Sequence, residues 1–159
     1  MNITPTKLII TLSCICGALL GCNVSGQIGD SFSFHKDKQD LEAAIDTLYA
    51  QHPEYKTPAG WEKYKQPILS SSPYIENKFF YLKDSSQALY CVTLVDDSAM
   101  SRDSAHSVIV IRAINKGSDK WLREEDATDK EQQKIANHFN KQIIAKLEAI
   151  TGTKARREE

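Results

Sequence analysis

The chain has 159 residues, with 20 basic and 21 acidic side chains and a formal net charge of −1 at pH 7. This balance lacks the basic excess of a nucleic-acid-binding face, so we expect no nucleic-acid partner. A chain of this length is typical of one domain, with a core large enough to fold without disulfide bonds.

The first segment is apolar. Leu8 to Gly21 is a run of 14 residues, interrupted by Thr11, Ser13 and two cysteines and preceded by Lys7. A membrane-spanning helix needs roughly 20 apolar residues, so this run is too short to span a bilayer but fits the centre of a secretory signal. We therefore expect residues 1–21 to be a cleaved signal peptide.

The sequence Leu19-Leu20-Gly21-Cys22 ends this run. It resembles the lipobox of bacterial lipoprotein precursors, and the resemblance covers residues 1–22. It implies cleavage before Cys22 and attachment of diacylglycerol to the Cys22 sulfur, a thiol suited to nucleophilic transfer. It also implies a palmitate-type anchor in the cell envelope, and with Asn23 next we expect the outer membrane, facing the periplasm. The alternatives are an unlipidated signal peptide or an apolar helix that stays attached.

Behind the anchor, residues 22–35 mix small and polar side chains and predict a flexible lipidated tether. A helix is predicted from Asp37 to His52, because apolar residues recur at steps of three and four and Pro53 follows. Residues 53–77 form a connection with four prolines, in which we expect a helical turn from Pro58 to Lys65.

Strands are predicted where β-branched and aromatic residues cluster, at 78–83, 88–95 and 108–114, with a possible edge strand at 120–124. A long helix follows, starting at the capping-box pair Thr128 and Glu131 and ending at Gly152. The expected fold is α+β: an antiparallel sheet of three to four strands with an N-terminal helix and a long C-terminal helix packed on it. The domain would occupy residues 36–152, and residues 153–159 would be a charged, solvated tail.

Side chains able to do chemistry are present without a catalytic pattern. Cys91 lies in an apolar strand and is expected to be buried and inert. The histidines (His35, His52, His106, His138) have no metal-ligand spacing, and the loop carrying Asp96, Asp97, Asp103 and His106 lacks the order of a calcium loop. We therefore expect no catalytic site, no metal and no cofactor, and not an enzyme.

Two further groups of residues have plain structural explanations. Ser70, Ser71 and Ser72 precede a proline and fit a turn. Glu124, Glu125 and Asp126 precede the last helix, where negative charge is favourable.

The most suggestive feature is the set of aromatic residues in the proline-rich connection: Tyr55, Trp61, Tyr64 and Tyr74. They predict either a surface for a protein partner or a cover for the open face of the sheet. We expect a lipid-anchored envelope protein of binding or structural type. The alternatives are an immunity-type lipoprotein that neutralises a periplasmic toxin and a cell-wall-active enzyme.

Overall fold

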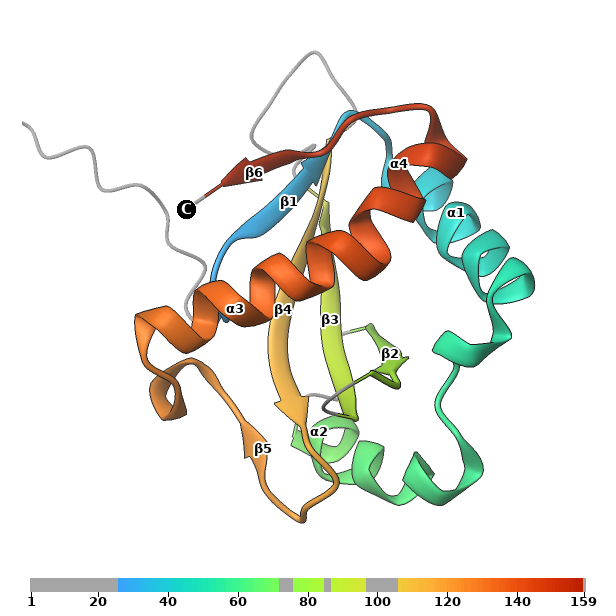
Figure 1. Ribbon diagram of the computed structural model, residues 1–159. Coiled ribbons are helices and arrows are strands. Elements are labelled where there is room, and N and C mark those ends of the chain that lie inside the picture. The colour runs from blue at the N-terminus through green and yellow to red at the C-terminus, as the bar shows by residue number, and fades with distance from the viewer. Residues whose placement is uncertain (1–25, 72–75, 85–86, 97–105, 159) are drawn as a thin grey trace, which may run out of the picture.

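The computed structural model describes residues 26–71, 76–84, 87–96 and 106–158, with the side chains of Ser70 and Ser71 left out. The protein is α+β, with an antiparallel six-stranded sheet in which β2, β3, β4, β1 and β6 follow one another and β5 pairs with β4 (Figure 1). The strands are β1 (Ser31–Phe34), β2 (Asn77–Leu82), β3 (Ala88–Asp96), β4 (Ser107–Asn115), β5 (Trp121–Leu122) and β6 (Arg156–Glu158). The helices are α1 (Lys38–Gln51), α2 (Lys65–Ser71), α3 (Asp129–Phe139) and α4 (Ala145–Thr151), with short 3-10 helices η1 (Pro53–Tyr55), η2 (Ala59–Tyr64) and η3 (Glu124–Asp126).

The predicted fold class is confirmed, but three to four strands was an underestimate. The four predicted strands correspond to β2, β3, β4 and β5. The two that were missed lie at the ends of the chain. β1 (Ser-Phe-Ser-Phe) does alternate polar and apolar residues, but over only four residues, and it lies within the predicted tether. β6 is three charged residues and carries no apolar pattern.

The predicted tether (residues 22–35) and the predicted tail (residues 153–159) were therefore both too long, because part of each belongs to the folded domain. Ile28, Phe32 and Phe34 are at most 1% exposed, so the chain is already part of the core within the segment 22–35. β1 pairs with β4 on one side and with β6 on the other, which puts residues 156–158 in the sheet as well. The domain is wider than the predicted span 36–152 at both ends.

The predicted first helix is present as α1. Asp37 caps its start, because its carboxylate accepts a hydrogen bond of 2.7 Å from the Asp40 backbone N–H. Its apolar stripe (Leu41, Ala44, Ile45, Leu48) is buried against the sheet.

The closing helix starts at the predicted capping box and ends at Gly152, whose φ of +67° suits glycine. It runs diagonally across the front of β4 and β3 (Figure 1). Unexpectedly, its middle turn, η4 (Asn140–Ile144), is π-helical. The wider turn places two consecutive residues, Ile143 and Ile144, fully inside the core.

The two faces of the sheet bury separate clusters. The larger lies between the sheet and the helices α1, α3 and α4, with Phe80 and Tyr90 from the strands around Phe139. The smaller lies on the opposite face, where Cys91, Leu89 and Trp121 are covered by Ile68 of α2 and by aromatic residues of η2. Both faces are covered, as the apolar strands require.

Candidate functional site

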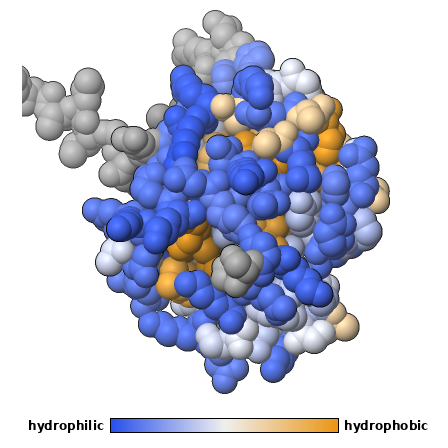
Figure 2. All heavy atoms as spheres, viewed as in Figure 1, coloured by the Kyte–Doolittle hydropathy of each residue, from blue (hydrophilic) through white to orange (hydrophobic). Residues whose placement is uncertain are grey.

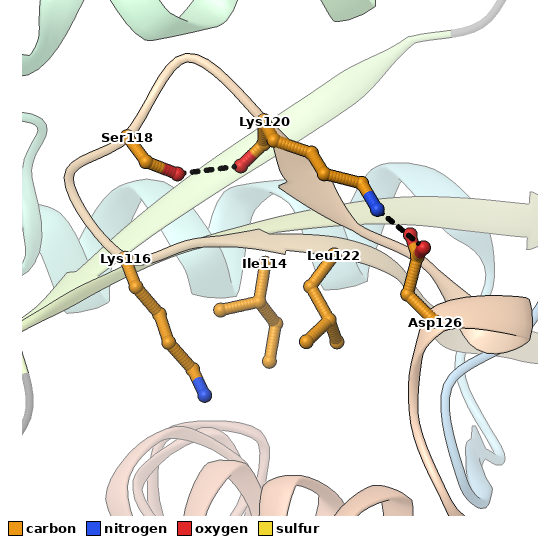
Figure 3. A pocket seen from close by; sticks show the side chains of 6 residues that line it. All are labelled: Ile114, Lys116, Ser118, Lys120, Leu122 and Asp126. Carbon is orange, nitrogen blue, oxygen red and sulfur yellow. Dashed lines mark hydrogen bonds and ion pairs between the residues drawn. The ribbon is translucent and has the colours of Figure 1, made fainter.

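A hollow of about 250 Å³ opens between the β4–β5 hairpin and α3 (Figure 3). We call it the hairpin groove; its lining residues are Ile114, Lys116, Ser118, Lys120, Leu122 and Asp126. Ile114 and Leu122 face each other across the two strands and form its apolar floor. Figure 2 shows apolar surface in the same region, between α3 and β5, surrounded by polar side chains. The groove is a small preformed hollow of mixed character, as binding sites often are.

The turn of the hairpin is held rigidly by one buried side chain. The Asn115 side-chain oxygen accepts hydrogen bonds from the backbone N–H groups of Gly117 (2.8 Å) and Ser118 (3.2 Å). Its amide nitrogen donates to the Ser118 carbonyl at 2.7 Å. Asn115 is fully buried and Gly117 has a φ of +83°, so the sequence Asn-Lys-Gly-Ser fits this turn.

The back of the hairpin rests on aromatic residues of η2. The Tyr64 hydroxyl donates to the Gly117 carbonyl at 3.1 Å, and the Trp121 indole N–H donates to the Tyr64 carbonyl at 2.8 Å. The Trp61 ring lies 3.4 Å from where a Cβ on Gly117 would be. Trp61 and Tyr64 therefore support the wall of the groove and help to cover the second face of the sheet.

The other predicted surface aromatics do not join them. Tyr55 is 8% exposed and belongs to the larger core, where the Lys146 ammonium lies 5.6 Å from its ring. Tyr74 lies outside the described residues. Among the residues described, the structure brings together two members of the predicted surface, Trp61 and Tyr64.

The rim of the groove carries charge. Lys120 pairs with Asp126 at 2.6 Å, and this contact, with the Arg123 backbone N–H, lowers the pKa of the Asp126 carboxyl. The exposed Lys116 stands on the opposite side (Figure 3). An apolar floor beside a lysine suits a ligand that combines an apolar group with a negative charge.

The groove adjoins the N-terminal end of the fold. The Glu124 carboxylate accepts hydrogen bonds from the backbone N–H groups of Gly26 (2.9 Å) and Gln27 (3.2 Å). Glu124 stands in the same short 3-10 helix as Asp126 of the rim. The first described residues and the groove thus share one side of the molecule.

A second hollow, of about 310 Å³, lies at the β2 edge of the sheet. It is lined by Glu54, Tyr55, Tyr81, Leu82, Lys83, Asp84 and Gln142. Beside it, Asp84 pairs with His138 Nε2, and His138 Nδ1 lies 2.9 Å from the Tyr90 hydroxyl. Burial and the nearby Asp84 charge raise the pKa of Tyr90, so the hydroxyl stays neutral and is not activated.

Sequence reasoning missed this Tyr90–His138–Asp84 contact, because the three residues come from β3, α3 and the end of β2. The expected state of Cys91 is seen: it is fully buried, and burial raises the pKa of its thiol to about 12. Such a thiol is a poor nucleophile near neutral pH.

Several predicted features fall outside the described residues: Cys22, Asp97, Asp103 and Ser72. In the part that is described, no three histidine, cysteine or acidic side chains form a group that could hold a metal ion. No described helix is both long and apolar enough to cross a bilayer.

The chain matches no family model, and neither a curated protein nor a solved structure is detectably similar to it.

Proposed function

We propose that the protein is a lipid-anchored binding protein of the bacterial envelope, fastened at Cys22 and holding a protein partner in the hairpin groove. The observation that carries the anchor is the lipobox-like sequence Leu19-Leu20-Gly21-Cys22, which ends six positions before the core residue Ile28. Ile28 is fully buried and its backbone N–H donates to the Ile111 carbonyl at 2.8 Å.

The link between anchor and fold is short. Four peptide units separate Cys22 from Gly26, which span at most about 14 Å when extended. Two hydrogen bonds from Glu124 then fix Gly26 and Gln27 to the domain. An anchored protein would therefore be held close to the bilayer, with the side that carries the groove next to the anchor.

The groove supports binding more than catalysis. Its lining offers an apolar floor (Ile114, Leu122), a lysine (Lys116) and an ion pair (Lys120 with Asp126). These groups recognise an apolar side chain next to a carboxylate on a partner. The carboxylate in this lining, that of Asp126, is paired with Lys120 and has a lowered pKa, whereas a general base needs a raised one.

Metabolic labelling with a palmitate analogue tests the anchor. We expect the label on the wild-type protein and none on Cys22→Ala, with Cys91→Ala as the matched control that keeps its label. Label that persists in Cys22→Ala, or a mature protein that still carries residues 1–21, contradicts the proposal.

Site-specific photo-cross-linking in cells tests the groove. A photoreactive residue at Lys116 is expected to capture one envelope protein reproducibly, and the same residue at the exposed Lys56, far from the groove, is expected to capture none. Lys116→Glu combined with a photoreactive residue at Ser118 should abolish the capture, because the partner's carboxylate would meet a negative charge. Equal capture at Lys56 and at the groove rules out specific binding there.

A further inference from the structure

Two histidines distant in the sequence meet at one end of the sheet. In the β1–β4 pair, Phe34 stands opposite Ser107. His35 follows the first and His106 precedes the second, so the antiparallel register brings them face to face. His35 is exposed and His106 is half-buried, which leaves the pair within reach of solutes.

The two rings are close and inclined to each other. His35 Nδ1 lies 3.3 Å from His106 Nε2, the ring centroids are 4.7 Å apart, and the ring planes meet at 68°. Two imidazole nitrogens bound to one tetrahedral metal ion at about 2.0–2.1 Å are about 3.3–3.4 Å apart. The two nitrogens are therefore already as far apart as two nitrogen ligands of one tetrahedral zinc ion.

We propose that His35 and His106 form a two-imidazole site for a divalent transition-metal ion such as Zn²⁺. In the metal-free protein one ring donates its N–H to the other ring's nitrogen. When a metal binds, the donor ring moves that proton to its other nitrogen, so both facing nitrogens offer a lone pair and no net proton is released. The remaining coordination positions are filled by water or by a group from a bound partner.

The chemistry of the pair also sets its selectivity. Imidazole nitrogens suit Zn²⁺, Cu²⁺ and Ni²⁺, whereas Mg²⁺ and Ca²⁺ prefer oxygen ligands. Both histidines are next to a paired position of the sheet, Phe34 opposite Ser107, so their backbones need little ordering when the metal binds. Among the described residues the site has two protein ligands, fewer than the four of a closed structural zinc site.

Isothermal titration with ZnCl₂ of the purified chain, with Cys14, Cys16 and Cys22 replaced by serine so that their thiols cannot bind the metal, tests this site. We expect one Zn²⁺ per chain and at least a tenfold loss of affinity in His35→Gln and in His106→Gln. The double variant should bind Zn²⁺ at least as weakly as either single variant, because no imidazole of the site remains. His106→Cys should keep the affinity within tenfold, because a thiolate also binds Zn²⁺.

The matched control is His52→Gln. His52 faces a carboxylate, that of Glu54, at 2.9 Å, and it is half-buried like His106. His52→Gln should leave the zinc affinity unchanged. Titration of the wild type with MgCl₂ in place of ZnCl₂ should show no measurable binding. Circular dichroism without metal verifies that each variant is folded.

NMR of the wild-type histidine rings gives an answer that needs no variant. Zn²⁺ should shift the ring signals of His35 and His106 and leave those of His52 and His138 in place. The proposal is wrong if the wild type binds no zinc up to millimolar concentration, if the four rings respond alike, or if both glutamine variants bind as well as the wild type.

Discussion

The guanidinium of Arg157 pairs with the carboxylate of Asp30, which stands 127 positions earlier in the chain. The same guanidinium donates to the side-chain oxygens of Asn137 (2.6 Å) and Gln133 (3.0 Å) on α3. Gln133 completes the network with a 2.9 Å hydrogen bond to the other Asp30 oxygen. One side chain thus joins both ends of the chain to the closing helix, and it explains why three charged residues form a strand.

Arg157→Ala is expected to destabilise the fold by about 2–3 kcal/mol. Asp30 is 4% exposed, and loss of its partner would leave a nearly buried carboxylate without its counter-charge. This expected loss of stability is small for a buried ion pair, because the Arg157 side chain is one-third exposed and partly screened by solvent. Urea unfolding followed by circular dichroism measures the change.

The neighbouring Arg156 provides the control. Its side chain is 79% exposed and pairs with Glu158 on the surface, so Arg156→Ala should change the stability by less than about 0.5 kcal/mol. If both arginine variants unfold at the same urea concentration, the network does not hold the terminal strand.

Gly29→Ala is expected to cost roughly 2–4 kcal/mol. Gly29 has a φ of +64°, and a Cβ there would lie 2.8 Å from the Gln132 carbonyl oxygen and 2.9 Å from the Ala136 Cβ. Both the left-handed backbone and the overlap with α3 are unfavourable for alanine.

Gly60→Ala is the matched substitution, because nothing lies within 4 Å of the Cβ it adds. Its stability should stay equal or rise slightly, since alanine reduces the freedom of the unfolded chain. Thermal melts of the two variants side by side measure the difference. Equal melting temperatures would mean that residues 26–30 do not pack on α3 as described.

The sequence was sufficient to predict the parts of this fold that repeat a pattern. The helix of residues 38–51, the capping box at Thr128 and the strands β2, β3, β4 and β5 all follow from periodicity and end signals. The Ser-Phe-Ser-Phe alternation of β1 was a local signal, but a short one that falls within the predicted tether. β6 has no apolar residue, and the pair that joins it to the domain, Asp30 and Arg157, is separated by almost the whole chain. The π-helical turn goes together with the burial of Ile144 in the core, and no local sequence signal predicts it.

The hairpin groove likewise combines features that a local sequence pattern predicts with contacts that only the folded chain makes. Trp61 and Tyr64 stood out by residue type, yet their position behind the hairpin depends on hydrogen bonds to Gly117 and Trp121. The hairpin groove itself combines the end of β4, a turn and β5 with a rim residue of η3. Asn115 followed by Gly117 was a local turn signal, but nothing in the sequence indicates which side chains face α3.

Asn115→Ala should loosen the wall of the groove and destabilise the protein by about 1–3 kcal/mol. The substitution removes the acceptor for two backbone N–H groups and the donor to the Ser118 carbonyl. Hydrogen exchange should quicken at Gly117 and Ser118 more than in β3. Ser118→Ala removes a single exposed hydrogen bond to the Lys120 carbonyl and should leave exchange at Gly117 as it is.

Cys91 should resist alkylation in the folded protein. Its thiol is fully buried with a pKa of about 12, so the thiolate fraction at pH 8 is roughly one in ten thousand. Peptide mapping after iodoacetamide treatment should find Cys91 unmodified in native buffer and fully modified in 6 M guanidinium. Rapid modification in native buffer would show that the smaller cluster opens readily.

The protein should lose stability above about pH 9, where the Cys91 thiol ionises in the unfolded chain, and more steeply above about pH 10, the ordinary pKa of tyrosine. Burial raises the pKa of both Tyr49 and Tyr90 in the folded state. The unfolded chain then releases these protons first as pH rises, so the folded state binds more protons and the free energy of unfolding falls with pH. Each tyrosine contributes up to about 1.4 kcal/mol per pH unit while it remains neutral in the folded state.

Urea unfolding between pH 9 and pH 11.5 measures this slope. Tyr90→Phe should be less stable at pH 8, because it loses the contact with His138, and should lose about a third of the slope above pH 10, because Tyr49 and Cys91 contribute the remainder. Tyr64→Phe is the control: it also removes a tyrosine hydroxyl that makes one hydrogen bond, but the Tyr64 hydroxyl bond is exposed. At pH 8 it should be destabilised less than Tyr90→Phe, because its hydrogen bond is exposed to solvent. A slope that Tyr90→Phe leaves unchanged would show that the hydroxyl of Tyr90 reaches solvent before the protein unfolds.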